Sequence, residues 1–208
     1  MGRPAIDRER VFSAARQAFL TRGVGLTTYD QIAAAAGVSR ATVYRSVGAR
    51  SDLVRGLLVE EAAVLFANVD RAMAGATSAA DLVALGVEAA LTTIRDRPLL
   101  RRLAGPDLPI VLPVLTTDGH GLIQAAVDAL LPLLERAATA GLVEDDELDR
   151  IAEDLVRYVI ALVHTPALRD DARRPGIGSA RAAALFGPAL ARTPVHDYFQ
   201  YSSRNGRL

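Results

Sequence analysis

The chain has 208 residues, half of them hydrophobic, enough to fill the core of one large domain or of a small domain joined to a larger one. It contains no cysteine, which excludes disulfides, thiolate metal sites and cysteine nucleophiles. The formal net charge is zero, but residues 1–56 hold nine arginines against four acidic residues, so a basic N-terminal part of charge +5 precedes a larger part of charge −5.

Helix-forming residues outnumber strand-forming residues, since alanine, leucine and arginine are abundant and aromatic residues make up only 5%. We therefore predict an all-α fold. No stretch approaches the roughly 18 consecutive apolar residues of a membrane helix. The opening segment MGRPAIDRER has no apolar signal core. The sequence thus predicts a soluble, cytoplasmic protein that has no membrane partner.

The predicted elements begin with helices at residues 7–22 and 29–36. The stripe of the first helix that we expect to be buried consists of Val11, Ala15, Ala18, Phe19 and Arg22. The second helix follows Thr28, which together with Gln31 has the form of a capping box. In such a box each side chain pairs with the backbone N–H of the other residue, so the pattern fixes where the second helix starts.

A sharp turn separates the second helix from a third at residues 40–47. Gly37 supplies the left-handed backbone that ends the second helix, and Ser39 is the N-cap of the third. Val38, just before this cap, can meet Val43 in a hydrophobic staple. Together these features predict a helix-turn-helix.

The rest of the chain is predicted to be helical, with breaks at glycine and proline. The longer helices fall at residues 51–74, 79–95, 121–140, 144–164 and 179–191. Residues 95–121 contain four prolines and three glycines, so we expect short helices and turns there. We divide the chain into a helix-turn-helix domain at 1–50, a helical domain at 51–195 and a tail at 196–208.

The third predicted helix has the features of a helix that reads DNA. Val43 and Val47 face inward, which leaves the polar residues from Arg40 to Ser46 outside. Arginine there can bind guanine, and small side chains can approach thymine methyl groups. The charge of the N-terminal part would attract phosphate. An ordinary exposed helix would also be polar, but the turn, cap, staple and charge together favour DNA binding.

The segment GLTTYDQIAAAAGVSRATVYRSVGARSDLVRGL, residues 25–57, resembles the N-terminal DNA-binding domain of TetR-type transcriptional regulators. The shared pattern is threonine at 28, Ile-Ala at 32–33, Ala-Gly-Val-Ser at 36–39, Thr-x-Tyr at 42–44 and arginine at 50. The resemblance implies DNA contacts at Thr28, Tyr29, Ser39, Arg40, Ala41, Thr42, Tyr44, Arg45, Ser46 and Arg50. Of these, Thr28, Tyr29 and Arg50 would meet phosphate.

The chain departs from the family pattern at Ser46, where the family commonly has tyrosine or histidine, and at Val47, where it often has phenylalanine. Val47 keeps the packing role, whereas Ser46 offers phosphate a weaker contact. This departure leaves a second reading open. The chain would then be a helical protein that binds a small molecule and whose DNA-binding head is degenerate.

For the C-terminal part, the resemblance implies a small-molecule pocket and a dimerisation face made by the last two long helices. A homodimer would present two recognition helices to successive major grooves of a palindromic operator. The resemblance also implies a repressor that an effector releases from double-stranded DNA, and the apolar composition predicts that this effector is small and largely apolar. The polar residues that would orient it are Asp118, His120, Gln124, Tyr158 and His164. Each of them also fits an ordinary exposed or hydrogen-bonded position.

The sequence contains no pattern typical of an enzyme. Its three histidines lie far apart, at 120, 164 and 196, and there is neither a Gly-rich phosphate loop nor a nucleophile elbow. The acidic run at 143–149 suits the start of a helix and lacks metal-ligand spacing. We therefore expect no catalytic residue, no metal and no cofactor.

Overall fold

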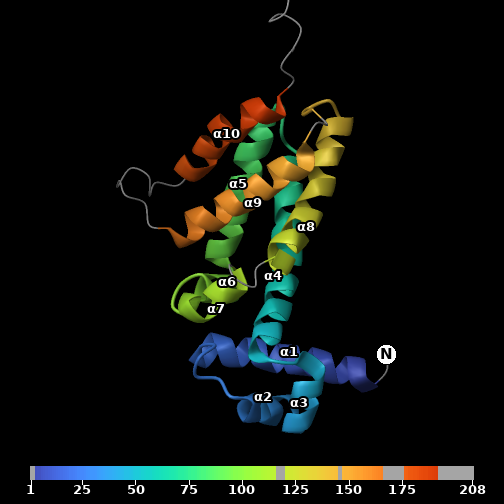
Figure 1. Cartoon of the computed structure of the whole chain (residues 1–208), viewed down its shortest axis with the longest axis vertical. Helices are drawn as coiled ribbons and strands as arrows, with labels where there is room; N and C mark the ends of the chain where they lie inside the picture. The colour runs from blue at the N-terminus through green and yellow to red at the C-terminus, as the bar shows by residue number, and fades with distance from the viewer. Residues whose placement is uncertain (1–2, 116–119, 145–146, 166–175, 192–208) are drawn as a thin grey trace, which may run out of the picture.

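The computed structural model describes residues 3–115, 120–144, 147–165 and 176–191, which form ten α-helices and no strand. The helices are α1 (Arg3–Arg22), α2 (Tyr29–Ala36), α3 (Arg40–Val47), α4 (Arg50–Met73), α5 (Ala79–Asp96), α6 (Pro98–Leu103), α7 (Leu108–Leu115), α8 (His120–Thr139), α9 (Leu148–His164) and α10 (Ile177–Leu190). The predicted all-α fold is confirmed (Figure 1). None of the helices described is both long and apolar enough to cross a membrane.

Most predicted helix boundaries agree with the structure to within one or two residues, but two N-termini differ. Helix α1 begins at Arg3, earlier than predicted, and α9 begins at Leu148, later than the predicted residue 144. The late start of α9 follows from Glu147, whose φ of 58° lies in the left-handed region and cannot continue a helix. In the proline-rich segment, Pro98 lies in the first turn of α6, where its missing N–H costs no hydrogen bond.

Helices α1–α3, which we call the head, pack around an apolar core at one end of the molecule (Figure 1). The α1 side chains in this core are Val11, Phe12, Ala15 and Phe19. The predicted stripe was wrong at Arg22, which is exposed, and it missed Phe12. Phe12 is buried because Gly56 of α4 lies against it, and a Cβ at Gly56 would come within 2.5 Å of its ring. That contact joins segments far apart in the chain.

Helix α4 connects the head to the body, the name we give to α5–α10 (Figure 1). It has 24 residues, which corresponds to a length of roughly 36 Å. Its first turns bury Leu53 and Leu57 in the head core, and its last turns bury Val69 and Met73 in the body core. One rigid element therefore belongs to both hydrophobic cores.

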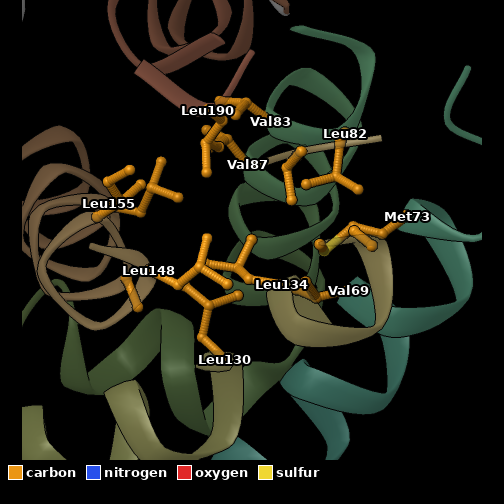
Figure 2. Packing of buried hydrophobic residues seen from close by; sticks show 14 of the residues in the cluster. Val69, Met73, Leu82, Val83, Val87, Leu130, Leu134, Leu148, Leu155 and Leu190 are labelled. Atoms are coloured by element: carbon orange, nitrogen blue, oxygen red, sulfur yellow. The ribbon is translucent and has the colours of Figure 1, made fainter. Parts of the chain in front are cut away.

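The body core is built from side chains of five helices (Figure 2). Its labelled members in Figure 2 are Val69, Met73, Leu82, Val83, Val87, Leu130, Leu134, Leu148, Leu155 and Leu190. They come from α4, α5, α8, α9 and α10. Helix α9 shows the pattern most clearly, because Leu148, Ile151 and Leu155 repeat at helical spacing and are all buried.

Candidate nucleic-acid interface and ligand cavity

The turn between α2 and α3 has the geometry that its sequence predicts. Gly37 has a φ of 67°, in the left-handed region where glycine pays no steric cost, although a Cβ there would touch nothing within 4 Å. The Val38 N–H donates to the Ala33 carbonyl oxygen at 3.0 Å, closing the end of α2. The Ser39 hydroxyl then accepts from the Thr42 N–H at 3.1 Å and caps α3. The predicted helix-turn-helix is present.

Helix α3 has an apolar inner side and a polar outer side. Val43 and Val47 are buried in the head core, as their spacing predicts. The residues exposed on α3 and its cap are Ser39, Arg40, Ala41, Tyr44 and Arg45, with Thr42 and Ser46 half-buried beside them. The structure thus brings these predicted DNA contacts to the accessible side of one short helix, whose diameter suits a major groove.

Two aromatic rings and one guanidinium form a cluster at the surface of the head. The ring centroids of Tyr29 and Tyr44 lie 4.6 Å apart, and the guanidinium carbon of Arg40 lies 5.7 Å from the Tyr44 centroid. Arg40 also pairs with Asp30 at 3.1 Å. Hydrogen bonding with Tyr44 and the charge of Asp30 raise the pKa of Arg40, so its side chain stays charged. These contacts orient Tyr44 and Arg40 before any partner arrives.

Tyr29 is the buried member of this cluster, and its ring packs against that of Tyr44. Its side chain is buried, and its hydroxyl donates to the Gly48 carbonyl oxygen at 3.0 Å. Burial raises the pKa of Tyr29, so the hydroxyl keeps its proton. In this conformation the hydroxyl is engaged within the protein, so the phosphate contact of Tyr29, which stays a prediction, would have to compete with this hydrogen bond. The resemblance could not show this, since the hydrogen bond depends on how α2 lies against the turn that follows α3.

The two remaining candidates for a phosphate contact, Thr28 and Arg50, also differ in whether the side chain is exposed or bound within the protein. Thr28 is exposed and forms the predicted capping box with Gln31, so it lies at the surface at the start of α2. Arg50 is half-buried, and its guanidinium donates to the carbonyl oxygens of Val24 and Thr27. Arg50 therefore ties the start of α4 to the loop before α2, and a phosphate contact would have to compete with these bonds.

A buried charge cluster connects the head to the body. Glu61 of α4 is only 1% exposed and accepts hydrogen bonds from Arg16 of α1 and from Arg97, between α5 and α6. A buried carboxylate is stable only when it is paired and hydrogen-bonded. The neighbouring Glu60 also pairs with Arg16, at 2.8 Å, but on the surface. Glu61 thus holds three elements together, and the sequence alone did not single it out.

A second polar contact lies on the other side of the junction. Asp107, just before α7, is buried and accepts from the Val24 backbone N–H at 3.1 Å and from Nε of Arg102 at 2.8 Å. Val24 lies in the head, 83 residues earlier in the chain. The segment that contains α6 and α7 is therefore hydrogen-bonded directly to the head.

The body contains a cavity of about 210 Å³ between α4, α5, α6, α7, α8 and α9. Among the described residues its wall consists of apolar side chains, with His164 as the polar exception. Leu103 and Val111 lie in this wall and also belong to the head core. The cavity is larger than the ~150 Å³ apolar cavity that can bind benzene. A small apolar molecule could therefore occupy it and touch side chains on which the head packs.

The predicted effector residues lie in different places. His164 is at the end of α9 and lines the cavity. Gln124 is exposed and donates to Asp128 on its own helix at 2.8 Å, and Tyr158 packs edge-on against Phe186, with centroids 5.5 Å apart. Neither Gln124 nor Tyr158 is part of the cavity wall. Asp118 lies outside the described residues, and the same holds for the side chain of His120.

Comparisons with known proteins agree with this geometry. The sequence model for "Bacterial regulatory proteins, tetR family" matches residues 11–57, the head and the start of α4. The HTH-type transcriptional regulator AlkX of Mycobacterium tuberculosis is 28% identical over 168 residues, which are 80% of this chain and 79% of that protein.

Two solved repressors share the fold through both parts of the molecule. The TetR family repressor AlkX from Dietzia sp., implicated in the biodegradation of n-alkanes, has a TM-score of 0.69 at 23% identity and covers 88% of this chain and 94% of its own. The transcriptional repressor QsdR of R. erythropolis has a TM-score of 0.67 at 21% identity and covers 92% and 99%. The head therefore matches the family model of TetR-type regulators, and the chain as a whole has the fold of solved TetR-family repressors.

Proposed function

We propose that this TetR-family regulator is a repressor that binds a palindromic operator as a homodimer and is released by a small, largely apolar effector. The observation that carries the proposal is the outer side of α3, where Arg40, Tyr44 and Arg45 are exposed above a buried apolar side. Arginine and small polar side chains on one helix are the groups that recognise base edges. The charge of +5 on residues 1–56 adds attraction to phosphate.

Dimerisation is expected through the last two long helices, and α10 supports this. Its outward side carries Ala180, Ala184, Leu185, Pro188 and Ala189, with Arg181 as its charged member. Leu185 is 63% exposed in the single chain, which is unusual for so large an apolar side chain. Small residues around one large one let two helices approach closely, so a second copy of α10 would cover this surface. A two-fold dimer also matches the symmetry of a palindrome.

The cavity and the junction suggest how an effector would act. Leu103 and Val111 line the cavity and pack in the head core, and Arg97 on the same segment binds Glu61. A ligand that favours another position of α6 and α7 would therefore change the contacts that these helices make with α1 and α4. In that conformation the distance between the two heads of the dimer would no longer match the distance between the operator half-sites. Effector and DNA would then each weaken binding of the other.

DNA binding is tested by selecting bound sequences from random duplex DNA with the native protein, Arg40→Ala and Tyr44→Ala. We expect a palindrome to be enriched by the native protein, and each substitution to weaken binding to it about tenfold or more, since one good base contact contributes ~1–3 kcal/mol. Arg136→Ala is the matched control, because Arg136 is an exposed arginine on α8 that pairs with a carboxylate, as Arg40 does, and α8 belongs neither to the head nor to the expected dimer face. It should bind like the native protein.

The alternative, a small-molecule-binding protein with a degenerate head, is favoured by one observation. Ser46 is half-buried on α3, at the position where the resemblance to the family implies tyrosine or histidine. Failure to enrich any sequence at low salt, where phosphate contacts are strongest, would support this alternative. If operator binding is found, its affinity is then measured with and without effector, and equal affinities would rule out the switch while leaving DNA binding intact.

A further inference from the structure

The cavity wall contains one polar side chain, His164, and one of its ring nitrogens has no partner within the described part of the chain. Nδ1 of His164 is buried and makes no hydrogen bond, although His164 closes α9 among apolar neighbours such as Val159, Ile160 and Val163. Leaving a buried polar atom unpaired is costly, so it is rare in folded proteins and calls for an explanation. A ligand that supplies the missing hydrogen bond would provide one.

The protonation of His164 restricts what that ligand can be. Burial lowers the pKa of His164, so the imidazole is neutral at pH 7. In a neutral imidazole one nitrogen donates and the other accepts, and a hydroxyl group can pair with either. A carboxylate can only accept, and moving its charge into an apolar cavity without a cationic partner is expensive. An alkane would leave Nδ1 unpaired.

The volume of the cavity restricts the size of the ligand. A cavity of ~150 Å³ lined by apolar side chains binds benzene. Scaled to the 210 Å³ of this cavity, that comparison corresponds to roughly eight non-hydrogen atoms. The wall beyond His164 is apolar, so everything except one end of the ligand should be hydrocarbon.

We propose that the cavity binds a small amphiphile, a hydrocarbon of about this size with a single terminal hydroxyl that hydrogen-bonds Nδ1 of His164. The inference rests on the proposed function only in taking the cavity as the effector site. It narrows the effector from an apolar molecule to one with a single hydroxyl, held at the end of α9.

The test uses the full chain without DNA and two pairs of probes of equal size. The hydroxyl probes are n-heptanol and para-cresol, and n-octane and para-xylene replace their hydroxyl with a methyl group. Binding is followed by calorimetry and by the rise in unfolding temperature at saturation. Three variants are compared with the native protein, after thermal unfolding has shown that each one folds: His164→Leu, His164→Asn and His164→Gln.

We expect at least one hydroxyl probe to bind the native chain and to lose about tenfold in affinity in His164→Leu, where the hydrogen bond is gone. His164→Asn should recover most of this loss, because its amide lies near the position of Nδ1, whereas His164→Gln places its amide near Nε2 and should not. The matched hydrocarbon should bind His164→Leu at least as tightly as the native chain.

Three results would overturn the inference. They are no binding of either hydroxyl probe to the native chain, unchanged affinity in His164→Leu, and an equal loss for the matched hydrocarbon. Operator binding is measured separately on the same preparation. A chain that binds the operator but no hydroxyl probe refutes the ligand class and leaves the regulator in place. A chain that binds the probe through His164 but binds no DNA refutes the proposed DNA-binding function and leaves the ligand class in place.

Discussion

Replacing Glu61 with glutamine is predicted to destabilise the protein strongly, although the two side chains have nearly the same shape. Glu61 is 1% exposed and accepts hydrogen bonds from Arg16 and Arg97. Hydrogen bonds to a charged group contribute ~1.5–3 kcal/mol each, about twice as much as neutral ones. The glutamine side chain also turns an NH₂ group toward one of the two guanidinium groups, where neither can accept.

The loss of free energy is moderated by solvent at the two arginines. The side chains of Arg16 and Arg97 are 25% and 35% exposed, so water partly replaces what they lose. We therefore expect Glu61→Gln to lower the free energy of unfolding by about 2 kcal/mol, below the 3–5 kcal/mol typical of breaking a fully buried pair. For a chain of this size the midpoint of thermal unfolding should fall by roughly 4–8 °C, measured by circular dichroism.

Glu60→Gln is the matched control, because Glu60 is the adjacent residue and pairs with the same Arg16 at 2.8 Å. Its side chain is 49% exposed. A surface pair of this kind contributes ~0.2–1 kcal/mol, so the unfolding midpoint should move by no more than about 4 °C. Equal losses in Glu60→Gln and Glu61→Gln, or no loss in Glu61→Gln, would refute the argument that burial of Glu61 makes its pairing important.

Three further predictions follow from the described contacts. Arg50→Ala should lower the free energy of unfolding by ~1–3 kcal/mol even without DNA, because two backbone carbonyls lose their partner, whereas Arg40→Ala should leave unfolding within ~0.5 kcal/mol and act on DNA affinity alone. The pKa of His164 is depressed below 6.5, so the unfolded chain takes up its proton first as the pH falls. Stability from this source is complete above pH 6.5 and decreases as the pH falls toward the folded-state pKa, and His164→Leu should remove this part of the pH dependence of unfolding. Leu185→Glu should yield monomers in sedimentation at concentrations where the native chain is dimeric, whereas Leu26→Glu, altering a side chain 76% exposed in the head, should not.

The helix-turn-helix could be predicted because its signals are local. The left-handed φ of Gly37, the cap at Ser39 and the capping box of Thr28 each depend on residues no more than four apart. The spacing of Val43 and Val47 likewise requires only that the segment be helical. All of these expectations are met in the structure. The inner and outer sides of α3 follow from them directly.

The features that the sequence could not show are contacts between distant segments. Tyr29 matched a family pattern for a DNA contact, yet its hydroxyl is bound to Gly48, beyond the recognition helix. Glu61 looks from its sequence like one more acidic residue on a solvated helix face, and its burial depends on Arg16 and Arg97, 45 and 36 residues away. Gln124 and His164 were equivalent candidates until the packing of α8 and α9 placed only the second of them in the cavity wall.

The sequence by itself determined the all-α class, the helix-turn-helix and the polar side of its recognition helix, because caps, φ preferences and helical periodicity act within a few residues. Only the tertiary structure decided which charges are buried, which predicted DNA contacts are engaged within the protein, and where the cavity lies. These properties depend on the distances between side chains that belong to different helices. No local pattern in the chain encodes such distances, so the site of His164 and the junction at Glu61 emerge only when the helices pack.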